Sequence, residues 1–488
     1  MRLSELLDDG NVRRTGEDVE IRGLAADSRA IEPGYLFAAL NGLKARGADY
    51  ITDAARQGAV AVLTRHDVAI PSEAGELAQV SDDHPRRRLA LMAARFYGAQ
   101  PKTIAAVTGT NGKSSTVSFA RQIWQLSGHP AASMGSLGVE ADGERIELQH
   151  TTPDPVALHR TLAKLARRGI DHVALEASSH GLDQHRLDGV TIRAAAFTNL
   201  TRDHFDYHGT AERYLEAKLR LFKELMGEGG AAVLNADVPE YEILRRVCRA
   251  RGHRILSFGR KGRDLKLVSS APSGAGQRLR IETGGTSHEI EIVLPGAFQA
   301  SNLLAAIGLT LASGLTFEAV LEALPRVSGV QGRLQAIPGH PREALIFVDY
   351  AHTPDALATA LTALRPYTRA RLVALFGCGG DRDRGKRPLM GEIAGRLADA
   401  VIVTDDNPRS EDPAAIRHEI CAACPNAEEI GDRARAIQAA VRQLQSGDVL
   451  LIAGKGHERG QIVGDRTIPF DDADCALDAV RALTGGRA

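Results

Sequence analysis

Several features that would place this sequence in other protein classes are scarce or missing. Five cysteines in 488 residues cannot make a disulfide framework. The net charge of −1 gives no overall field that would attract nucleic acid or a membrane surface. No apolar run approaches the length of a membrane span, and the first residues lack the apolar core of a signal peptide. We therefore expect a cytoplasmic protein that binds anionic ligands at local sites and has no nucleic-acid partner.

The length and composition are those of a globular protein with more than one core. The hydrophobic fraction is 43% and the charged fraction 25%, both ordinary for folded domains. A chain of 488 residues is too long for one core and suggests about three domains. Cys421 and Cys424 lie in a helical pattern with no second pair of metal ligands nearby, so we expect them to pack inside the protein.

The central motif is a phosphate-binding loop. Residues 104–107 predict a buried strand, and residues 109–115 form a glycine turn that opens a helix. Backbone N–H groups and a helix N-terminus in this arrangement bind anionic oxygens. Lys113 is expected on the β- and γ-phosphates and the Ser114 hydroxyl on a magnesium ion. The alternative, a glycine turn with a purely structural role, does not explain the Lys-Ser pair and the helix directly behind it.

Strands and helical stretches alternate from about residue 101, which predicts a mostly parallel sheet. Polar residues follow the predicted strands 172–176 and 194–198, among them Glu176, Asp203 and His204. Ligands collect at the carboxyl ends of parallel strands. These side chains therefore predict a site for a divalent cation, although each alone could be an ordinary loop residue.

Lys218 occupies the middle of an apolar helical face. In the predicted helix over 212–223, Tyr214 and Phe222 lie four residues to either side of it. One interpretation is a lysine whose stem lies on the apolar face while its amine reaches water. The other is a desolvated amine with a lowered pKa that is often neutral and reactive. The sequence leaves both open.

The last part of the chain restarts the α/β pattern. Residues 265–292 predict short antiparallel strands, and a boundary falls near 324–333. Three later strands end in charged residues, around Arg382, around Asp406 to Arg409, and around Gly454 to Glu458. Because arginine binds carboxylates with two hydrogen bonds, this density predicts a site for a small zwitterion with carboxylates. Surface charge without a ligand is the alternative.

Together these motifs resemble those of the Mur ligases. The residues that carry the resemblance are 109–115, 176–180, Asn199, 203–204, Tyr214 with Lys218, 294–296 and 349–352, in the family's order over nearly the whole chain. Within the family, residues 204–209, 377–383, 406–409 and 454–458 look like those of members that add meso-diaminopimelate to UDP-N-acetylmuramoyl-L-alanyl-D-glutamate. Gln299 stands where the family usually has asparagine, and Gln331 where it has proline.

The resemblance implies an α/β fold with three domains. These are a UDP-substrate domain over residues 1–99, a central phosphate-loop ATPase domain with a mostly parallel sheet over 100–330, and a Rossmann-like amino-acid domain over 331–488. It also implies an ATP-dependent ligase of peptidoglycan precursor synthesis that acts through an acyl phosphate. Two magnesium ions, small-molecule substrates and a monomer would go with this activity.

The resemblance also assigns residues to each part of the reaction. Lys113, Glu176, His204 and Lys218 would be catalytic, and Ser114, Glu176, His204 and a carbamylated Lys218 (N6-carboxylysine) would hold magnesium. ATP would lie on Gly109, Thr110, Asn111, Gly112, Lys113, Ser114, Ser115, Asn302, Arg333 and Asp349. The UDP substrate would lie on Ser28, Leu43, Lys44, Ala45, Thr151, Thr152, Ser178, Gln184 and Arg186. Diaminopimelate would lie on Arg382, Asp406, Asn407, Pro408, Arg409, Gly454 and Glu458.

Three other functions remain open on the sequence. The same ligation could use L-lysine. A folylpolyglutamate synthase would also join an amino acid to an acyl phosphate, but that family's site lacks the run from Asp406 to Arg409 and leaves the Ser28 loop without a role. A phosphate-loop switch that signals by hydrolysing nucleotide would leave the later cluster of arginine and glutamate unexplained.

Overall fold

The structure, a computed structural model, describes residues 1–7, 12–42, 45–201 and 203–485. It divides into two compact units. The first comprises Met1–Phe258 and Ala305–Thr316, and the second Gly259–Leu304 and Phe317–Ala488. The expected α/β fold is confirmed, because every large sheet in these ranges is flanked by helices. Within the same ranges, no helix combines the length and apolar character needed to cross a membrane.

The first unit begins with a five-stranded sheet in the order β1-β5-β4-β3-β2. Its strands are parallel except β1, which pairs antiparallel with β5. The strands are β1 Arg13–Thr15, β2 Gly23–Ala25, β3 Tyr35–Ala38, β4 Ala61–Thr64 and β5 Ala78–Ser81, with helices α1 Ile51–Arg56 and α2 Pro85–Tyr97.

The phosphate loop belongs to a larger sheet of the first unit. Its strands run in the order β9-β8-β7-β10-β6-β11-β12-β13. The neighbours β7, β10, β6, β11, β12 and β13 are parallel, as the sequence predicts, whereas β8 and β9 pair antiparallel. Their bounds are β6 Thr103–Thr108, β7 Ala131–Gly135, β8 Gly138–Ala141, β9 Glu144–Ile146, β10 His172–Glu176, β11 Ile192–Phe197, β12 Met226–Asn235 and β13 Arg254–Gly259.

Helices cover this sheet because its central strands are continuous apolar runs that are buried on both faces. Leu158, Leu182, Phe222 and Leu244 pack with Ile104 in one buried cluster, while α3 lies along β6, β7 and β10. The helices are α3 Lys113–Leu126, α4 Pro155–Arg167, α5 Ser179–Asp183, α6 Phe205–His208, α7 Ala211–Arg220 and α8 Tyr241–Ala250. The helix predicted over 212–223 ends three residues earlier in the structure, at Arg220. A π-helical turn, Leu221–Leu225, follows it directly.

The second unit contains the predicted antiparallel strands and a second parallel sheet. β14 Leu265–Ser273, β15 Gly276–Thr283 and β16 Thr286–Ile292 pair antiparallel. The other sheet has the order β17-β18-β22-β19-β20-β21, with only β17 antiparallel. Its strands are β17 Gln335–Ile337, β18 Leu345–Asp349, β19 Leu372–Phe376, β20 Ala400–Val403, β21 Glu428–Glu429 and β22 Val449–Ala453, followed by a hairpin of β23 Gly460–Val463 and β24 Arg466–Pro469.

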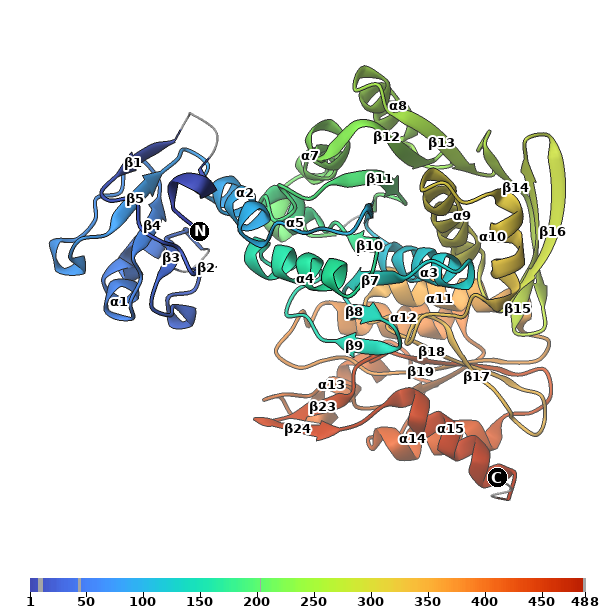
Figure 1. Ribbon diagram of the computed structural model, residues 1–488. Coiled ribbons are helices and arrows are strands. Elements are labelled where there is room, and N and C mark those ends of the chain that lie inside the picture. The colour runs from blue at the N-terminus through green and yellow to red at the C-terminus, as the bar shows by residue number, and fades with distance from the viewer. Residues whose placement is uncertain (8–11, 43–44, 202, 486–488) are drawn as a thin grey trace. The chain divides into compact units, whose positions relative to one another are not determined.

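Both faces of this second sheet are buried, as in a Rossmann-like domain. Phe347 and Leu451 point into one apolar cluster, and their neighbours Ile346 and Leu450 into another. Helices α11 Pro354–Leu364, α12 Lys386–Leu397 and α13 Pro413–Cys421 complete the first cluster, and α14 Arg433–Gln443 and α15 Asp472–Leu483 the second (Figure 1). Cys424 is buried in the first cluster, which confirms that the cysteine pair packs. The remaining helices are α9 Ala297–Ala312 and α10 Phe317–Ala323.

Candidate functional site

The phosphate loop connects the end of β6 to the start of α3. Gly109 and Gly112 have φ angles of +145° and +86°, which favour glycine. A Cβ atom on Gly109 would lie 2.0 Å from the Thr198 hydroxyl oxygen, so any larger residue would have to displace Thr198. The Asn111 N–H donates to the Asn199 side chain over 2.9 Å. The end of the neighbouring strand β11 thus holds the loop in place.

Lys113 and Lys218 both reach this loop. The Lys113 amine donates to the carbonyl oxygens of Gly109 and Thr110, over 3.0 and 2.7 Å. Lys218 is 1% exposed, lies 4.3 Å from the centre of the Tyr214 ring, and donates to the Gly109 oxygen over 2.8 Å. Burial, followed by the charge of Lys113, holds the pKa of the Lys218 amine well below its usual value. The burial of Lys218 excludes the interpretation in which its amine reaches water, whereas the reactivity of the amine stays a prediction.

Glu176 is a buried carboxylate beside the loop. It ends β10, where it pairs with Val107 of β6, and is 2% exposed. Its oxygens accept hydrogen bonds from the Ser136 N–H over 2.8 Å and the Ser136 hydroxyl over 3.3 Å. No cationic side chain among the described residues forms an ion pair with it. A buried carboxylate without a neutralising charge is suited to a divalent cation.

His204 and Lys218 lie against the same aromatic ring. The ring centres of His204 and Tyr214 are 6.3 Å apart, and the Lys218 amine lies over the Tyr214 ring. His204 is 3.4 Å from the Asp203 carboxylate. Among the residues that the structure describes, no group of three or more His, Cys, Asp or Glu side chains is arranged to hold a metal. A magnesium ion here would therefore need hydroxyl, carbamate or substrate oxygens as well.

Most residues expected at the UDP substrate form one hydrogen-bonded group. The Thr152 hydroxyl donates to the Glu176 carbonyl over 2.8 Å and lies 2.9 Å from the Ser178 hydroxyl. The Arg186 guanidinium donates to the Thr152 carbonyl over 2.6 Å and to the Gln184 side chain over 2.8 Å. Thr151 joins through Ser136, 3.0 Å away. Ser28 and Ala45 lie on loops after β2 and β3, and the expected Leu43 and Lys44 fall outside the described residues.

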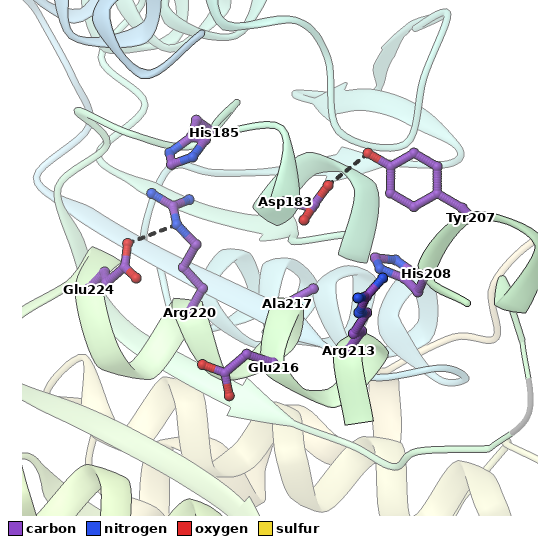
Figure 2. Close-up of a pocket in the computed structure, with 9 residues that line it drawn as sticks. All are labelled: Asp183, His185, Tyr207, His208, Arg213, Glu216, Ala217, Arg220 and Glu224. Atoms are coloured by element: carbon purple, nitrogen blue, oxygen red, sulfur yellow. Dashed lines mark hydrogen bonds and ion pairs between the residues drawn. The ribbon is translucent and has the colours of Figure 1, made fainter. Parts of the chain in front are cut away.

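A cavity of about 600 Å³ adjoins this group (Figure 2). The Tyr207 hydroxyl accepts from the Gln184 amide over 3.1 Å and donates to Asp183 over 2.7 Å. The lining of the cavity carries charges of both signs and comes from α5 to α7, their connections and the π-helical turn after α7, namely Asp183, His185, Tyr207, His208, Arg213, Glu216, Ala217, Arg220 and Glu224. Tyr207 thus connects the cavity to Gln184.

The residues expected at the nucleotide in the second unit also lie close together. The Asn302 amide donates to Gln299 over 3.0 Å, and the Gln299 amide donates to the Arg333 carbonyl over 3.4 Å. Asp349 accepts from the Leu334 N–H over 2.7 Å, and burial raises the pKa of its carboxyl. Gln299, which stands where the family usually has asparagine, therefore still places a side-chain amide between Asn302 and Arg333.

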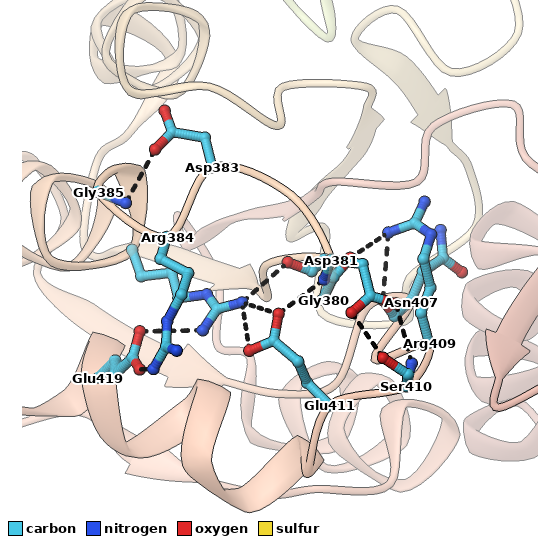
Figure 3. A network of polar contacts seen from close by, with 12 residues as sticks. Gly380, Asp381, Asp383, Arg384, Gly385, Asn407, Arg409, Ser410, Glu411 and Glu419 are labelled. Atoms are coloured by element: carbon cyan, nitrogen blue, oxygen red, sulfur yellow. Dashed lines mark hydrogen bonds and ion pairs between the residues drawn. The ribbon is translucent and has the colours of Figure 1, made fainter.

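The three predicted strand ends meet in the second unit. The Asn407 amide donates to Glu458 over 2.9 Å, and the Lys455 amine donates to Asn407 over 2.9 Å and to Glu458 over 3.2 Å. A Cβ atom on Gly454 would lie 2.6 Å from an Asp406 carboxylate oxygen. The Arg409 guanidinium donates to the Gly380 carbonyl over 2.8 Å (Figure 3). Pro408 lies against Gly380, and Arg382 is exposed on the loop after β19.

Sequence reasoning gave no role to three residues at these sites. Lys455 is 0% exposed and bridges Asn407 and Glu458. The Tyr350 ring lies 4.8 Å from the Arg333 guanidinium, and Ser136 holds Glu176. The position of Lys455 directly after a buried strand was a usable signal, whereas nothing in the sequence distinguishes Ser136 from an ordinary loop serine.

Three family models match successive parts of the chain. They are described as Mur ligase family, catalytic domain, over residues 20–97; Mur ligase middle domain, over 107–310; and Mur ligase, glutamate ligase domain, over 332–456. The chain belongs to the Mur ligase family. Members of this family are ATP-dependent ligases, and so is this chain.

Curated relatives of this Mur ligase extend over almost its whole length. A UDP-N-acetylmuramoyl-L-alanyl-D-glutamate–2,6-diaminopimelate ligase from Bradyrhizobium diazoefficiens is 49% identical, with 98% of this chain and 99% of the relative covered. A ligase of the same name from Caulobacter vibrioides is 49% identical, with 99% of each chain covered. The chain is thus similar to diaminopimelate ligases from end to end.

Solved structures give the same family and fold. A structure of a UDP-N-acetylmuramoyl-L-alanyl-D-glutamate–2,6-diaminopimelate ligase is 35% identical, has a TM-score of 0.72 and covers 95% of each chain. A folylpolyglutamate synthase from Mycobacterium tuberculosis is 18% identical, with a TM-score of 0.62, 82% of this Mur ligase covered and 95% of the synthase. That second likeness shows only a shared fold. The expected three-domain α/β architecture is confirmed, whereas the exact boundaries stay a prediction.

Proposed function

We propose that this Mur ligase joins meso-diaminopimelate to UDP-N-acetylmuramoyl-L-alanyl-D-glutamate, with ATP converted to ADP and phosphate. The observation that carries the choice of amino acid is the cluster of Asp406, Asn407, Arg409, Gly454 and Glu458 at the ends of β20 and β22. The names of relatives about half identical over the full length support it. The enzyme would act in the cytoplasm on a peptidoglycan precursor, as a monomer.

Phosphoryl transfer is proposed at the phosphate loop. The loop N–H groups and the N-terminus of α3 would hold the phosphates of ATP, on the seven residues from Gly109 to Ser115. Lys113 would leave the loop carbonyls and place its charge on the transferring phosphoryl group. Asn302, Arg333 and Asp349 would bind the rest of the nucleotide. The D-glutamate carboxylate would receive the phosphoryl group and become an acyl phosphate.

The residues at the loop fit magnesium. Ser114, in the first turn of α3, and the buried, unneutralised Glu176 offer oxygen atoms for one ion, and His204 with a modified Lys218 would hold a second. When bound, magnesium neutralises the charge that develops on the phosphate oxygens. Ser136 would keep the Glu176 carboxylate oriented toward the ion.

Lys218 is proposed to be carbamylated. Its lowered pKa leaves a neutral amine whose lone pair can attack the carbon of CO₂, and loss of one proton then gives a carbamate anion. The product replaces a buried amine with an anionic oxygen ligand, which a hard cation prefers. Lys218 and His204 lie against the same Tyr214 ring, so both would face one ion.

Substrate recognition is divided between the two units. In the first, Thr151, Thr152, Ser178, Gln184 and Arg186 would hold the peptide end of the UDP substrate, while Ser28, Leu43, Lys44 and Ala45 would hold the uridine end. In the second, Arg409, with Arg382, would bind the far carboxylate of diaminopimelate, and Glu458 and the Gly454 carbonyl its far ammonium. Asp406, Asn407 and Pro408 would shape that site.

The test is phosphate release measured with a panel of amino acids. Release should require both the UDP-muramoyl dipeptide and an amino acid, with meso-diaminopimelate preferred over L-lysine. A preference for lysine would show that the amino-acid site is misassigned. Release with nucleotide alone would instead indicate a phosphate-loop hydrolase.

A further inference from the structure

Two loops of the second unit are fastened together beside Arg409. The Asp381 carboxylate, after β19, accepts from the Ser410 hydroxyl over 2.6 Å and from the Ser410 N–H over 3.1 Å (Figure 3). In return, the Glu411 carboxylate, after β20, accepts from the Asp381 N–H over 2.6 Å. We call Asp381, Ser410 and Glu411 the loop clasp.

Arg387 anchors the loop clasp to α12. Its side chain is 0% exposed and donates to both Glu411 carboxylate oxygens, over 2.8 and 3.0 Å. A second guanidinium nitrogen donates to Glu419 of α13 over 3.0 Å. The hydrogen bonds from Arg387 hold the pKa of Glu411 down at about 2, so this carboxylate is charged at any working pH. Both bonds to Glu411 come from one guanidinium nitrogen, and with the bond to Glu419 they hold the Glu411 carboxylate against α12 and α13.

Arg409 has a backbone conformation that its surroundings must hold. Its φ angle is +51°, and that of Asp381 is +53°. Such angles are uncommon for residues other than glycine and persist where neighbouring contacts determine them. The Arg409 N–H donates to the Ile462 carbonyl over 3.0 Å, and the Gly464 N–H donates to the Arg409 carbonyl over 2.7 Å. The hairpin of β23 and β24 therefore holds one side of Arg409, and the loop clasp begins at the next residue.

The clasp also fixes the acceptor for the Arg409 side chain. The guanidinium donates to the Gly380 carbonyl, and Gly380 immediately precedes Asp381. The Gly380 N–H donates in turn to the Asn407 carbonyl over 2.9 Å. A displacement of Asp381 would therefore move Gly380 and release the arginine.

We propose that Asp381, Ser410 and Glu411 are positioning residues that hold the Arg409 guanidinium ready for the far carboxylate of the amino acid. Selectivity against amino acids without that carboxylate would then depend on a cluster that need not touch the substrate. An arginine that is already held in place loses little conformational freedom when it binds the far carboxylate, so more of the contact's free energy goes into binding. This inference rests on the proposed function and explains how its specificity residue is held.

The experiment compares Asp381→Ala and Ser410→Ala with Asp412→Ala. Asp412 lies on the same loop and accepts from the Ala414 N–H over 3.0 Å as the cap of α13, outside the loop clasp. Both clasp variants should raise the KM for diaminopimelate by about tenfold and reduce its preference over lysine, with kcat and the KM for ATP within about twofold of wild type. Asp412→Ala should lower the melting temperature through the lost cap but leave the KM for diaminopimelate unchanged.

A double variant separates positioning from general destabilisation. If the clasp acts through Arg409, then Asp381→Ala should add no further increase in KM to Arg409→Ala. Ser410→Thr, which keeps the hydroxyl, should behave as wild type. If Asp381→Ala unfolds the protein, the comparison of Ser410→Ala with Ser410→Thr still tests the inference. Additive effects, or clasp variants with an unchanged KM for diaminopimelate, would overturn the inference. A wild type that does not use diaminopimelate, or an Arg409→Ala variant without effect, would instead overturn the proposed function.

Discussion

The amines of Lys113 and Lys218 donate to one oxygen atom, the carbonyl of Gly109, over 3.0 and 2.8 Å. A proton on Lys218 would be repelled by the nearby charge of Lys113, which is second to burial in lowering the pKa of Lys218. The phosphate loop and α7 are therefore coupled through a backbone atom. Carbamylation of Lys218 would replace this repulsion with attraction.

Lys113→Ala should lower the rate of phosphate release by at least about a hundredfold, because the variant loses the loop cation aimed at the transferring phosphoryl group. The measurement is ATP-dependent phosphate release at saturating substrates. Lys164→Ala, at an exposed position of α4, is the control and should match wild type. Turnover near the wild-type rate in Lys113→Ala would show that the loop does not carry out phosphoryl transfer.

Lys218→Ala should lose activity and recover part of it when short carboxylic acids are added, because these can supply the missing oxygen ligand. Lys223→Ala, whose amine pairs with exposed Glu216 over 2.6 Å, is the matched control. Mass spectrometry of active wild type should show a gain of one carboxyl group at Lys218. A bare amine in fully active enzyme would contradict the carbamate.

The buried Lys218 amine also predicts a pH dependence of stability. Its pKa in the folded protein lies well below 10.5, so between that lowered value and about 10.5 the unfolded chain binds more protons. In CO₂-free buffer, stability of wild type relative to Lys218→Met should therefore rise with pH across this window. Urea unfolding at several pH values measures it, and a difference that stays constant with pH would show that the amine is not desolvated.

Arg409→Ala should raise the KM for meso-diaminopimelate by about a hundredfold and hardly change that for ATP, because the far carboxylate loses its bidentate partner. The measurement is a pair of specificity constants, for meso-diaminopimelate and L-lysine. Arg396→Ala, on the exposed side of α12, should leave both constants unchanged. Full preference for diaminopimelate in Arg409→Ala would mean that another group reads the far carboxylate.

Gly456→Ala should destabilise the second unit much more than Gly284→Ala. The two glycines have φ angles of +55° and +57°, so the backbone cost of about 1–2 kcal/mol is common to both. At Gly456 the added methyl group would also lie within 2.8 Å of Tyr350 backbone atoms, while at Gly284 nothing lies within 4 Å. Thermal unfolding of the two variants measures the difference, and equal melting temperatures would show that the loops at Tyr350 and Gly456 can separate freely.

The sequence by itself determined the elements and the end of each strand where polar residues gather. Buried strands such as β6 and β22 are short apolar runs, and the glycine turn at Gly109 is a local pattern, so both can be recognised without any distant residue. The motif order was enough to assign the Mur ligase family. The helix carrying Lys218 was also predicted, although its end was placed three residues late because a π-helical turn continues the helical pattern.

Only the tertiary structure decided which of these residues meet. Lys218 reaches Gly109 across 109 positions in the chain, and Asn407 reaches Glu458 across 51. Such contacts depend on the order of strands in a sheet. The spacing of apolar residues in the sequence, with a period of two in strands and 3.6 in helices, does not reveal that order. For the same reason the burial of Lys218, the support of Glu176 by Ser136 and the loop clasp beside Arg409 could not be read from the sequence. Their physical basis is the packing of parallel strands, whose carboxyl ends bring separate loops to one edge.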